Sequence, residues 1–388
     1  MNIFITGASG FVGGEVLVEL SKKEQIEKIF CLVRAKSQDE GILRVKKVFD
    51  FHHDLFDDKV IVPVVGDLLD DTFLEDLKSN DQLHCVDTII HAAANTSFSR
   101  MKDDLVERVN IGGLLKVIEW SKTLPNLKTF AYIGTATICG CGNDVKNRLL
   151  LETDSPNRSA KHFVKYTDTK LRGELLLHAH LPEDKILILR PSIIMGDSRM
   201  WIPRSYVILW ALATCNLIRL LPLQPNIEVD VVSIDYVAQA IVALLLAKRQ
   251  YNVYHISSGN ASKSSILKCA KALAPYFLDK PDFKFVDHAL ISQMKNWAKN
   301  RLQSKAELYL YPEYLNYWDV IFEDKGKLRV LFAGLEPYIE FMQLGQVFDN
   351  TRLMEDTGMA PCKPVHEYIL SSIPLLEKID VYDGALDP

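Results

Sequence analysis

The chain has 388 residues, of which 48% are apolar and 24% are charged, and its formal net charge is −5. This composition supplies a full hydrophobic core and excludes a largely disordered chain. The slight negative charge gives no general attraction to nucleic acid or to membrane surfaces, so we expect no nucleic acid partner. The length suits a nucleotide-binding domain with a substrate-binding part attached.

The cysteines and the apolar stretches bear on location. Seven cysteines, an odd number without paired spacing, predict reduced thiols and a cytoplasmic protein. Cys139 and Cys141 are two positions apart, which does not fit a zinc or redox pair, so no metal site is expected. The chain begins within the first expected strand, which leaves no room for a signal peptide. Residues 206–223 are apolar, but their uninterrupted part is too short to span a bilayer. We expect a buried or lid helix there and no stable membrane insertion.

The first 20 residues predict a strand, a glycine-rich turn and a helix in direct succession. Residues 1–5 are an apolar run, residues 14–20 have helical apolar spacing, and between them lie Thr6, Gly7, Ala8, Ser9, Gly10, Phe11, Val12 and Gly13. Gly7 permits a tight turn, Gly10 lets the backbone approach a pyrophosphate, and Gly13 lets the helix pack on the strand. The helix N-terminus offers N–H groups to the phosphates. A turn without a ligand is the alternative interpretation.

Four further apolar runs predict strands, over residues 29–33, 59–65, 87–90 and 127–133, and residues 110–120 predict a helix on the sheet. Strands that alternate with helices form a parallel sheet covered on both faces. We therefore expect an α/β fold with a Rossmann-like, doubly wound parallel sheet. Its ligands should lie beyond the carboxyl ends of the strands.

The residue after the second expected strand bears on the choice of cofactor. NAD usually meets an acidic residue here, which accepts hydrogen bonds from the ribose hydroxyls. This chain has Arg34, whose guanidinium can pair with a 2′-phosphate, so we expect NADPH. Stacking of Arg34 on the adenine, or exposure to water, is the alternative.

Other strand ends offer further contacts to a dinucleotide. Asp67 can accept a hydrogen bond from the adenine amino group, and Leu68 can cover the ring. His91 is a candidate ligand contact, although a strand-end histidine satisfied within the protein explains it equally well. The small residues Ala92 and Ala93 let the backbone run beside the pyrophosphate and ribose.

A candidate catalytic group follows the fifth expected strand. Thr135 stands at the strand end, and Tyr166 and Lys170 are spaced i and i+4, which places both on one face of a helix. A phenol has a pKa near 10, and a neighbouring ammonium is expected to lower that pKa. Lys170 can also hold the nicotinamide ribose, and Thr135 can donate to the same carbonyl oxygen as the tyrosine. A surface tyrosine with a solvated lysine is the alternative.

Together these segments resemble the extended short-chain dehydrogenases/reductases. The matching segments are residues 6–13, 66–68, 91–94, 135–140, 166–170 and 190–192. The resemblance implies that Thr135, Tyr166 and Lys170 are catalytic and that Asn110 is a structural or proton-relay residue. It also implies that Pro191 belongs to the cofactor site and that the backbone at Ser192 and Ile193 faces the nicotinamide carboxamide.

Two stretches resemble one branch of these enzymes, the thioester reductases and fatty acyl-CoA reductases. Residues 196–199, Gly-Asp-Ser-Arg, follow the Arg-Pro strand as in that branch, and residues 31–35 are similar to its NADPH site. Sugar epimerases and dehydratases often carry a tyrosine where this chain has Cys139. Residues 232–238 match a helix start common to all these branches and do not discriminate.

We expect residues 1–190 to form the NADP-binding domain, with residues 228–260 returning to the sheet through a late strand at 253–257. Residues 191–227 and 261–388 would form a smaller, mainly helical substrate-binding or lid part.

Three features mark this second part. Residues 262–273 predict a helix capped by Ser262. The aromatic-rich residues 308–322 suit packing of a small lid better than the wall of an acyl pocket. The basic residues of a further expected helix could dock coenzyme A or an acidic carrier, but a solvated face is favoured. They are Lys295, Lys299, Arg301 and Lys305.

The resemblance to the thioester and fatty acyl-CoA reductase branch, together with Arg34, therefore implies an NADPH-dependent reductase of acyl thioesters that forms an aldehyde or alcohol. The acyl group would arrive on coenzyme A or on an acyl or peptidyl carrier protein. One alternative is an NAD(P)-dependent carbonyl or hydroxyl dehydrogenase, or a sugar-nucleotide epimerase or dehydratase. A cofactor-sensing protein without chemistry is the other, although such proteins tend to lose the Tyr or Lys that this chain keeps.

Overall fold

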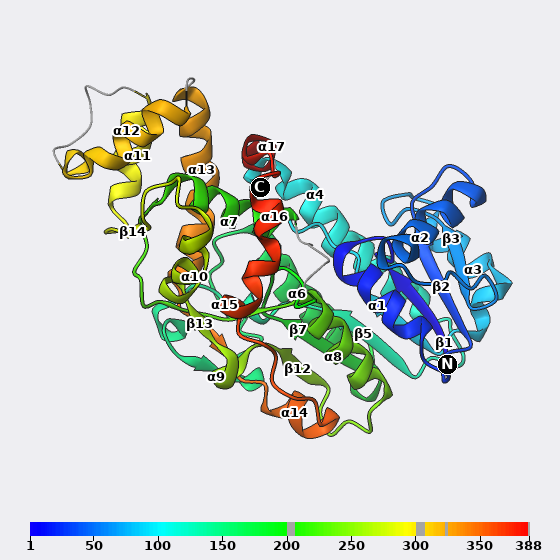
Figure 1. The fold of residues 1–388 in the computed structure, drawn as a ribbon. Helices are drawn as coiled ribbons and strands as arrows, with labels where there is room; N and C mark the ends of the chain where they lie inside the picture. Colours follow the sequence, from blue (N-terminus) through cyan, green and yellow to red (C-terminus); the bar gives the residue numbers. More distant parts are fainter. Residues whose placement is uncertain (200–205, 300–306, 323–324, 387–388) are drawn as a thin grey trace.

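A sheet of seven parallel strands lies at the centre of the protein, in the order β12-β7-β5-β4-β1-β2-β3 (Figure 1). The structure is a computed structural model that describes residues 1–199, 206–299, 307–322 and 325–386. The seven strands are β1 (Asn2–Thr6), β2 (Lys28–Val33), β3 (Ile61–Val65), β4 (Thr88–His91), β5 (Thr129–Ile133), β7 (Ile186–Pro191) and β12 (Val253–Ile256). The expected parallel α/β fold is confirmed.

Helices cover both faces of the sheet because alternate strand side chains point to opposite sides. Ile3 and Ile5 pack into one apolar cluster with helices α1, α2 and α8, and Phe4 packs into another with α3, α5 and α6. These helices are α1 (Phe11–Ser21), α2 (Gln38–His52), α8 (Ile234–Leu246), α3 (Phe73–Ser79), α5 (Leu114–Ser121) and α6 (Lys165–His180).

The expected strands are all present, with bounds shifted by one or two residues. The late strand is confirmed as β12, which pairs with β7. The helix expected over 110–120 has two parts, a π-helical turn at Arg108–Gly113 followed by α5. Strand order reverses between β1 and β4, which is where an open parallel sheet leaves a crevice for ligands.

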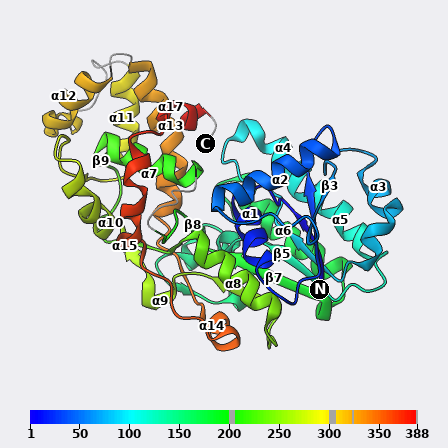
Figure 2. The ribbon, with the colours of Figure 1, turned by 45° about the vertical axis from the view of Figure 1, so that its right-hand side comes forward.

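The second part of the chain is mainly helical and lies beside the sheet (Figures 1 and 2). Its helices are α7 (Tyr206–Ile218), α9 (Gly259–Ser262), α10 (Ile266–Leu273), α11 (Leu290–Lys299), α12 (Pro312–Ile321), α13 (Lys325–Met342), α14 (Thr351–Thr357), α15 (Val365–Tyr368), α16 (Ile373–Leu376) and α17 (Val381–Leu386). Short paired strands tie it together: β8 (Ile193–Ile194) with β11 (Val231–Val232), β9 (Leu220–Leu221) with β14 (Lys284–Phe285), β10 (Glu228–Val229) with β13 (Ser264–Ser265), and β6 (Leu149–Leu150) with β15 (Val347–Phe348).

Two expectations for this part are corrected. The helix predicted over 206–223 ends at Ile218, and the chain then enters β9. The helix predicted from Ser262 starts at Ile266, and its cap is Ser265, whose hydroxyl accepts a hydrogen bond from the N–H of Lys268. Ser262 instead donates to the carbonyl of Cys362. No helix in the described ranges has the length and apolar character that crossing a bilayer requires.

The aromatic-rich segment 308–322 packs within the helical part, as expected. Tyr314, Trp318 and Phe322 are buried in one apolar cluster with α11 and α13. Of the basic run, Lys295 pairs with Glu336 at 2.7 Å. Lys299 is exposed at the end of α11, and Arg301 and Lys305 fall outside the described residues.

Candidate active site

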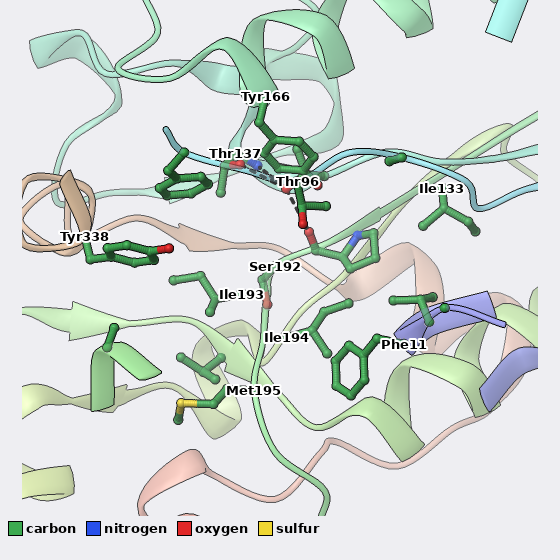
Figure 3. Close-up of a pocket in the computed structure, with 18 of the residues that line it drawn as sticks. Phe11, Thr96, Ile133, Thr137, Tyr166, Ser192, Ile193, Ile194, Met195 and Tyr338 are labelled. Atoms are coloured by element: carbon green, nitrogen blue, oxygen red, sulfur yellow. Dashed lines mark hydrogen bonds between the residues drawn. The ribbon is translucent and has the colours of Figure 1, made fainter. Parts of the chain in front are cut away.

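A cavity of about 990 Å³ starts at the carboxyl ends of the central strands and continues among the helices of the second part. Most residues that the sequence predicts for the site line this cavity. They are Gly7, Ser9, Gly10, Phe11, Val12, Gly13, Arg34, Asp67, Leu68, Ala92, Ala93, Thr135, Tyr166, Lys170, Pro191, Ser192 and Ile193. Thr6, His91 and Asn110 do not line it. In Figure 3, Tyr166 and Thr137 face Ser192 and Ile193 across the cavity.

The glycine turn has the shape that a dinucleotide needs. Gly7 has a φ of +71°, and a Cβ there would lie 2.7 Å from the backbone nitrogen of Ala93. A Cβ on Gly13 would lie 2.1 Å from the carbonyl oxygen of Gly7. Any side chain at either position would therefore push the turn apart. The first residues of α1 line the cavity, so the helix N-terminus can meet phosphates there.

Thr6 and His91 lie behind the cavity wall. The Thr6 hydroxyl is 3.1 Å from Nδ1 of His91 and accepts a hydrogen bond from the N–H of Ala93. Burial, together with the charge of Lys170, lowers the pKa of His91 to about 3, so the imidazole is neutral. Both side chains therefore tie β1 to β4 beneath the site.

Arg34 and Asp67 line the cavity just beyond the carboxyl ends of β2 and β3. The Arg34 side chain is exposed and makes no hydrogen bond or ion pair with any described residue. Asp67 accepts a hydrogen bond from the N–H of Leu69, which fixes its carboxylate in the turn after β3. An exposed guanidinium at the edge of the cavity can form an ion pair with an anionic group.

Hydroxyl groups converge at the middle of the cavity. The Thr135 hydroxyl lies 2.9 Å from that of Thr137, and it also hydrogen-bonds the Tyr166 phenol. Thr135 and Thr137 are buried on the turn after β5, and Tyr166 stands at the start of α6. The sequence interpretation missed Thr137; its spacing of two from Thr135 on the same turn was the available signal.

The expected effect of Lys170 on the tyrosine is wrong in this structure. Burial raises the pKa of Tyr166 to about 12, and the hydrogen bond from Thr135 opposes this rise only in part. The Lys170 ammonium instead donates to the carbonyl oxygen of Ile133, at 2.7 Å, and lies 4.8 Å from the centre of the Tyr132 ring. Tyr166 is therefore a neutral phenol near neutral pH, which suits a proton donor.

Lys170 is 3% exposed, and burial lowers its pKa from 10.5 to about 7. The folded protein then binds fewer protons than the unfolded chain between these values, so burial of the lysine costs less stability as pH rises from 7 toward 10.5. We expect the wild type to gain about 1 kcal/mol of stability per pH unit relative to Lys170→Met above pH 7.

This expectation is checked by comparing thermal unfolding of the two proteins across that pH range. The exposed Lys128→Met controls for removal of a positive charge. A stability difference between wild type and Lys170→Met that stays constant with pH would contradict the lowered pKa.

Asn110 is a positioning residue rather than part of the cavity wall. Its side-chain oxygen accepts from the N–H of Asn95, and its amide donates to the Asn95 carbonyl and to the Thr169 hydroxyl. Thr169 in turn donates to the carbonyl of Tyr166. Asn110, on the π-helical turn, thus joins the loop after β4 to the start of α6.

The Gly-Asp-Ser-Arg run joins the two parts of the chain. Arg199 reaches Asp197 and Glu15 of α1, each at 2.6 Å. Ser198 donates to Asp235 of α8 through both its N–H and its hydroxyl. The run therefore anchors the loop after β8 against the helix whose N-terminus faces the cavity.

A second ion pair fixes α6 to the sheet. Arg190 and Glu174 have side chains that are 0% exposed and meet at 2.7 Å. Arg190 also donates to the carbonyls of Glu152 and Ser155. Because Glu174 is one turn beyond Lys170, this pair holds the face of α6 that carries Lys170 against β7.

Beyond the hydroxyl groups the cavity continues as an apolar arm, which sequence analysis did not predict. Its walls come from β8, α7, β9, β10, β11, α10, the strand region near Phe283, and α15 with the following turn. The residues are Met195, Ala211, Leu212, Cys215, Leu221, Leu223, Val229, Val231, Ile266, Cys269, Ala270, Leu273, Phe283, Val365 and Ile369. Rings of Phe98, Tyr338 and Phe341 stand where the arm meets Tyr166.

Sequence comparisons place the chain in a family and identify relatives. A model of an NAD-binding family described as male sterility protein matches residues 5–241. Fatty acyl-CoA reductase 2 of Homo sapiens is 24% identical over 373 residues, which cover 81% of this chain and 69% of the human protein. The Drosophila melanogaster protein CG8303, provisionally named a fatty acyl-CoA reductase, is 26% identical over 348 residues, or 77% of this chain. The chain spans 62%, 54% and 27% of the length of three curated relatives that it matches.

Solved structures share the fold. The terminal R domain from the myxalamid PKS-NRPS pathway aligns with a TM-score of 0.70 at 21% identity, covering 97% of this chain and 90% of that domain. A thiolation-reductase di-domain from an archaeal non-ribosomal peptide synthetase gives 0.67 at 22% identity, covering 98% and 76%. UDP-glucuronic acid 4-epimerase of Bacillus cereus gives 0.63 at 18% identity, covering 97% and 99%. The chain therefore belongs to the NAD-binding family described as male sterility protein, shares its fold with thioester reductase domains and an epimerase, and is similar in sequence to fatty acyl-CoA reductases.

Proposed function

We propose that this protein is an NADPH-dependent reductase of acyl thioesters, whose acyl group arrives on coenzyme A or on an acyl or peptidyl carrier protein. The supporting observation is one cavity that runs from the glycine turn, past Tyr166, into the apolar arm. Apart from two cysteine thiols, the described arm residues carry no polar side chain. Burial of an acyl chain against these side chains favours binding, whereas the hydroxyls of a sugar nucleotide would lose their hydrogen bonds to water there.

The hydroxyl groups supply what reduction of a carbonyl requires. When bound, the nicotinamide supplies a hydride to the carbonyl carbon of the thioester. Tyr166 and Thr135 are hydrogen-bond donors for the carbonyl oxygen, where negative charge develops. Tyr166 can then transfer its proton to that oxygen, and Thr137 holds the Thr135 hydroxyl in place. The hemithioacetal expels its thiol and leaves an aldehyde, so thioester, NADPH and a proton become aldehyde, thiol and NADP⁺.

Lys170 has a positioning role in this proposal. Its ammonium donates one hydrogen bond to Ile133, and an ammonium carries three N–H groups. The remaining N–H groups are available to the ribose hydroxyls of the nicotinamide. The lysine would thereby fix the ring beside the Tyr166 phenol.

Turnover by the purified protein tests the proposal. With NADPH and an acyl-CoA, we expect oxidation of NADPH that depends on the thioester and releases thiol and aldehyde in equal amounts. The aldehyde can be trapped with a hydrazine, or followed to the alcohol. Failure to consume NADPH with acyl thioesters, combined with turnover of sugar nucleotides or tightly bound NAD, would favour an epimerase or dehydratase instead.

Arg34 gives a prediction about the cofactor. Arg34→Ala is expected to lower the ratio of kcat/KM for NADPH to that for NADH by about ten- to a hundredfold, because it removes a charge-assisted hydrogen bond to the 2′-phosphate. The exposed neighbour Lys36→Ala, which does not line the cavity, should leave the ratio unchanged. An unaltered ratio in Arg34→Ala would remove the reason for preferring NADPH.

A further inference from the structure

We propose that the small side chains of Ala211, Cys215 and Ala270 in the apolar arm set the longest acyl chain that the enzyme accepts. The inference rests on the proposed function and goes further, because it assigns substrate selection to particular residues. All three side chains line the arm and are almost fully buried.

The arm runs between two apolar clusters of the second part of the chain. One cluster contains Trp210 and Leu221, and the other contains Met195 and Leu273. Ile266 and Phe283 pack against both clusters. The cavity therefore occupies a seam between two packed bodies, and the size of the side chains along the seam determines its free length.

Two helices present their smallest residues to this seam. Ala211 and Cys215 are four residues apart on α7, which places them on one face. On α10, the residues that reach the cavity are Ile266, Cys269, Ala270 and Leu273, again along one face. An alanine on each lining face leaves room that a larger side chain would fill.

The ring of Phe283, which lines the arm, packs against a buried arginine. Arg219 is 1% exposed, and its guanidinium lies 4.2 Å from the centre of the Phe283 ring. Backbone carbonyls of Asn216 and Pro281 accept hydrogen bonds from the same guanidinium. The buried guanidinium therefore supports the Phe283 ring where that ring lines the arm.

A series of straight-chain substrates tests the assignment. With butyryl-, octanoyl- and hexadecanoyl-CoA, the wild type should gain about fourfold in kcat/KM per added methylene until the arm is full, which corresponds to burial of one CH₂. Ala270→Phe should lower the ratio of kcat/KM for hexadecanoyl-CoA to that for butyryl-CoA about tenfold or more, because the arm is then overfilled for the long chain. Phe283→Ala should shift the preference toward longer chains.

Lys271→Phe is the matched control, because it adds the same ring on the exposed side of α10. Affinities of the same acyl-CoAs, measured by calorimetry without NADPH, provide a readout that does not need turnover. If the protein shows no turnover but binds acyl-CoAs according to chain length, and Ala270→Phe weakens that binding, the selection of chain length by the arm stands and the proposed function fails. If the protein turns over acyl-CoAs and neither Ala270→Phe nor Phe283→Ala changes its chain-length profile, the arm residues do not select chain length, and the proposed function stands.

Discussion

Tyr166→Phe is expected to lower kcat for acyl thioester reduction by about 10²- to 10⁴-fold while the protein still binds NADPH. The phenol lines the middle of the cavity, where it can pass a proton to the carbonyl oxygen, and general acid catalysis contributes effects of this size. Its pKa, raised by burial to about 12, keeps it protonated at neutral pH. Loss of one neutral hydrogen bond should weaken the affinity for NADPH by no more than about tenfold.

Single-turnover kinetics and NADPH titration measure the two quantities separately. Tyr317→Phe removes a half-buried phenol on α12 that lies outside the cavity, and it should change neither quantity. Equal losses of binding and turnover in Tyr166→Phe would show that the phenol holds the cofactor rather than acting on the substrate. Unchanged cellular function in that variant would point to a cofactor-sensing protein.

Local patterns were sufficient to predict that the glycine turn and the start of α6 line one cavity. The turn from Gly7 to Gly13 is continuous in sequence, and strand, turn and helix are each specified by nearby residues. Lys170 follows Tyr166 by one helical turn, so their common face also follows from spacing. Thr135 joins them because it lies on the turn after β5, a central strand next to β7, and parallel strands share one carboxyl edge.

The apolar arm could not be predicted in this way. Its walls come from short elements spread along the chain between Met195 and Ile369, and none of them has a pattern that differs from ordinary core packing. The spacing of Tyr166 and Lys170 also could not predict that the pKa of Tyr166 is raised. The ammonium of Lys170 turns to the carbonyl of Ile133, and that partner is visible only in three dimensions.

The buried pair of Arg190 and Glu174 connects stability to the site. A Cβ on Gly134, the residue before Thr135, would lie 2.9 Å from the carboxylate of Glu174. The pair therefore packs directly beneath the turn that carries the threonine hydroxyls. Removal of one partner leaves the other charge buried without its counter-ion, which is far more costly than removal of both.

We expect Glu174→Gln to lower the free energy of unfolding by about 3–5 kcal/mol. The double variant Glu174→Leu with Arg190→Met should recover most of that loss, because it leaves no buried charge. Urea denaturation measures both variants. The control is Glu75→Gln, in a pair with Lys78 whose side chains are 73% and 37% exposed, and it should cost less than about 1 kcal/mol. A double variant as unstable as the single one would mean that the arginine's hydrogen bonds to Glu152 and Ser155, rather than its pairing with Glu174, hold α6 in place.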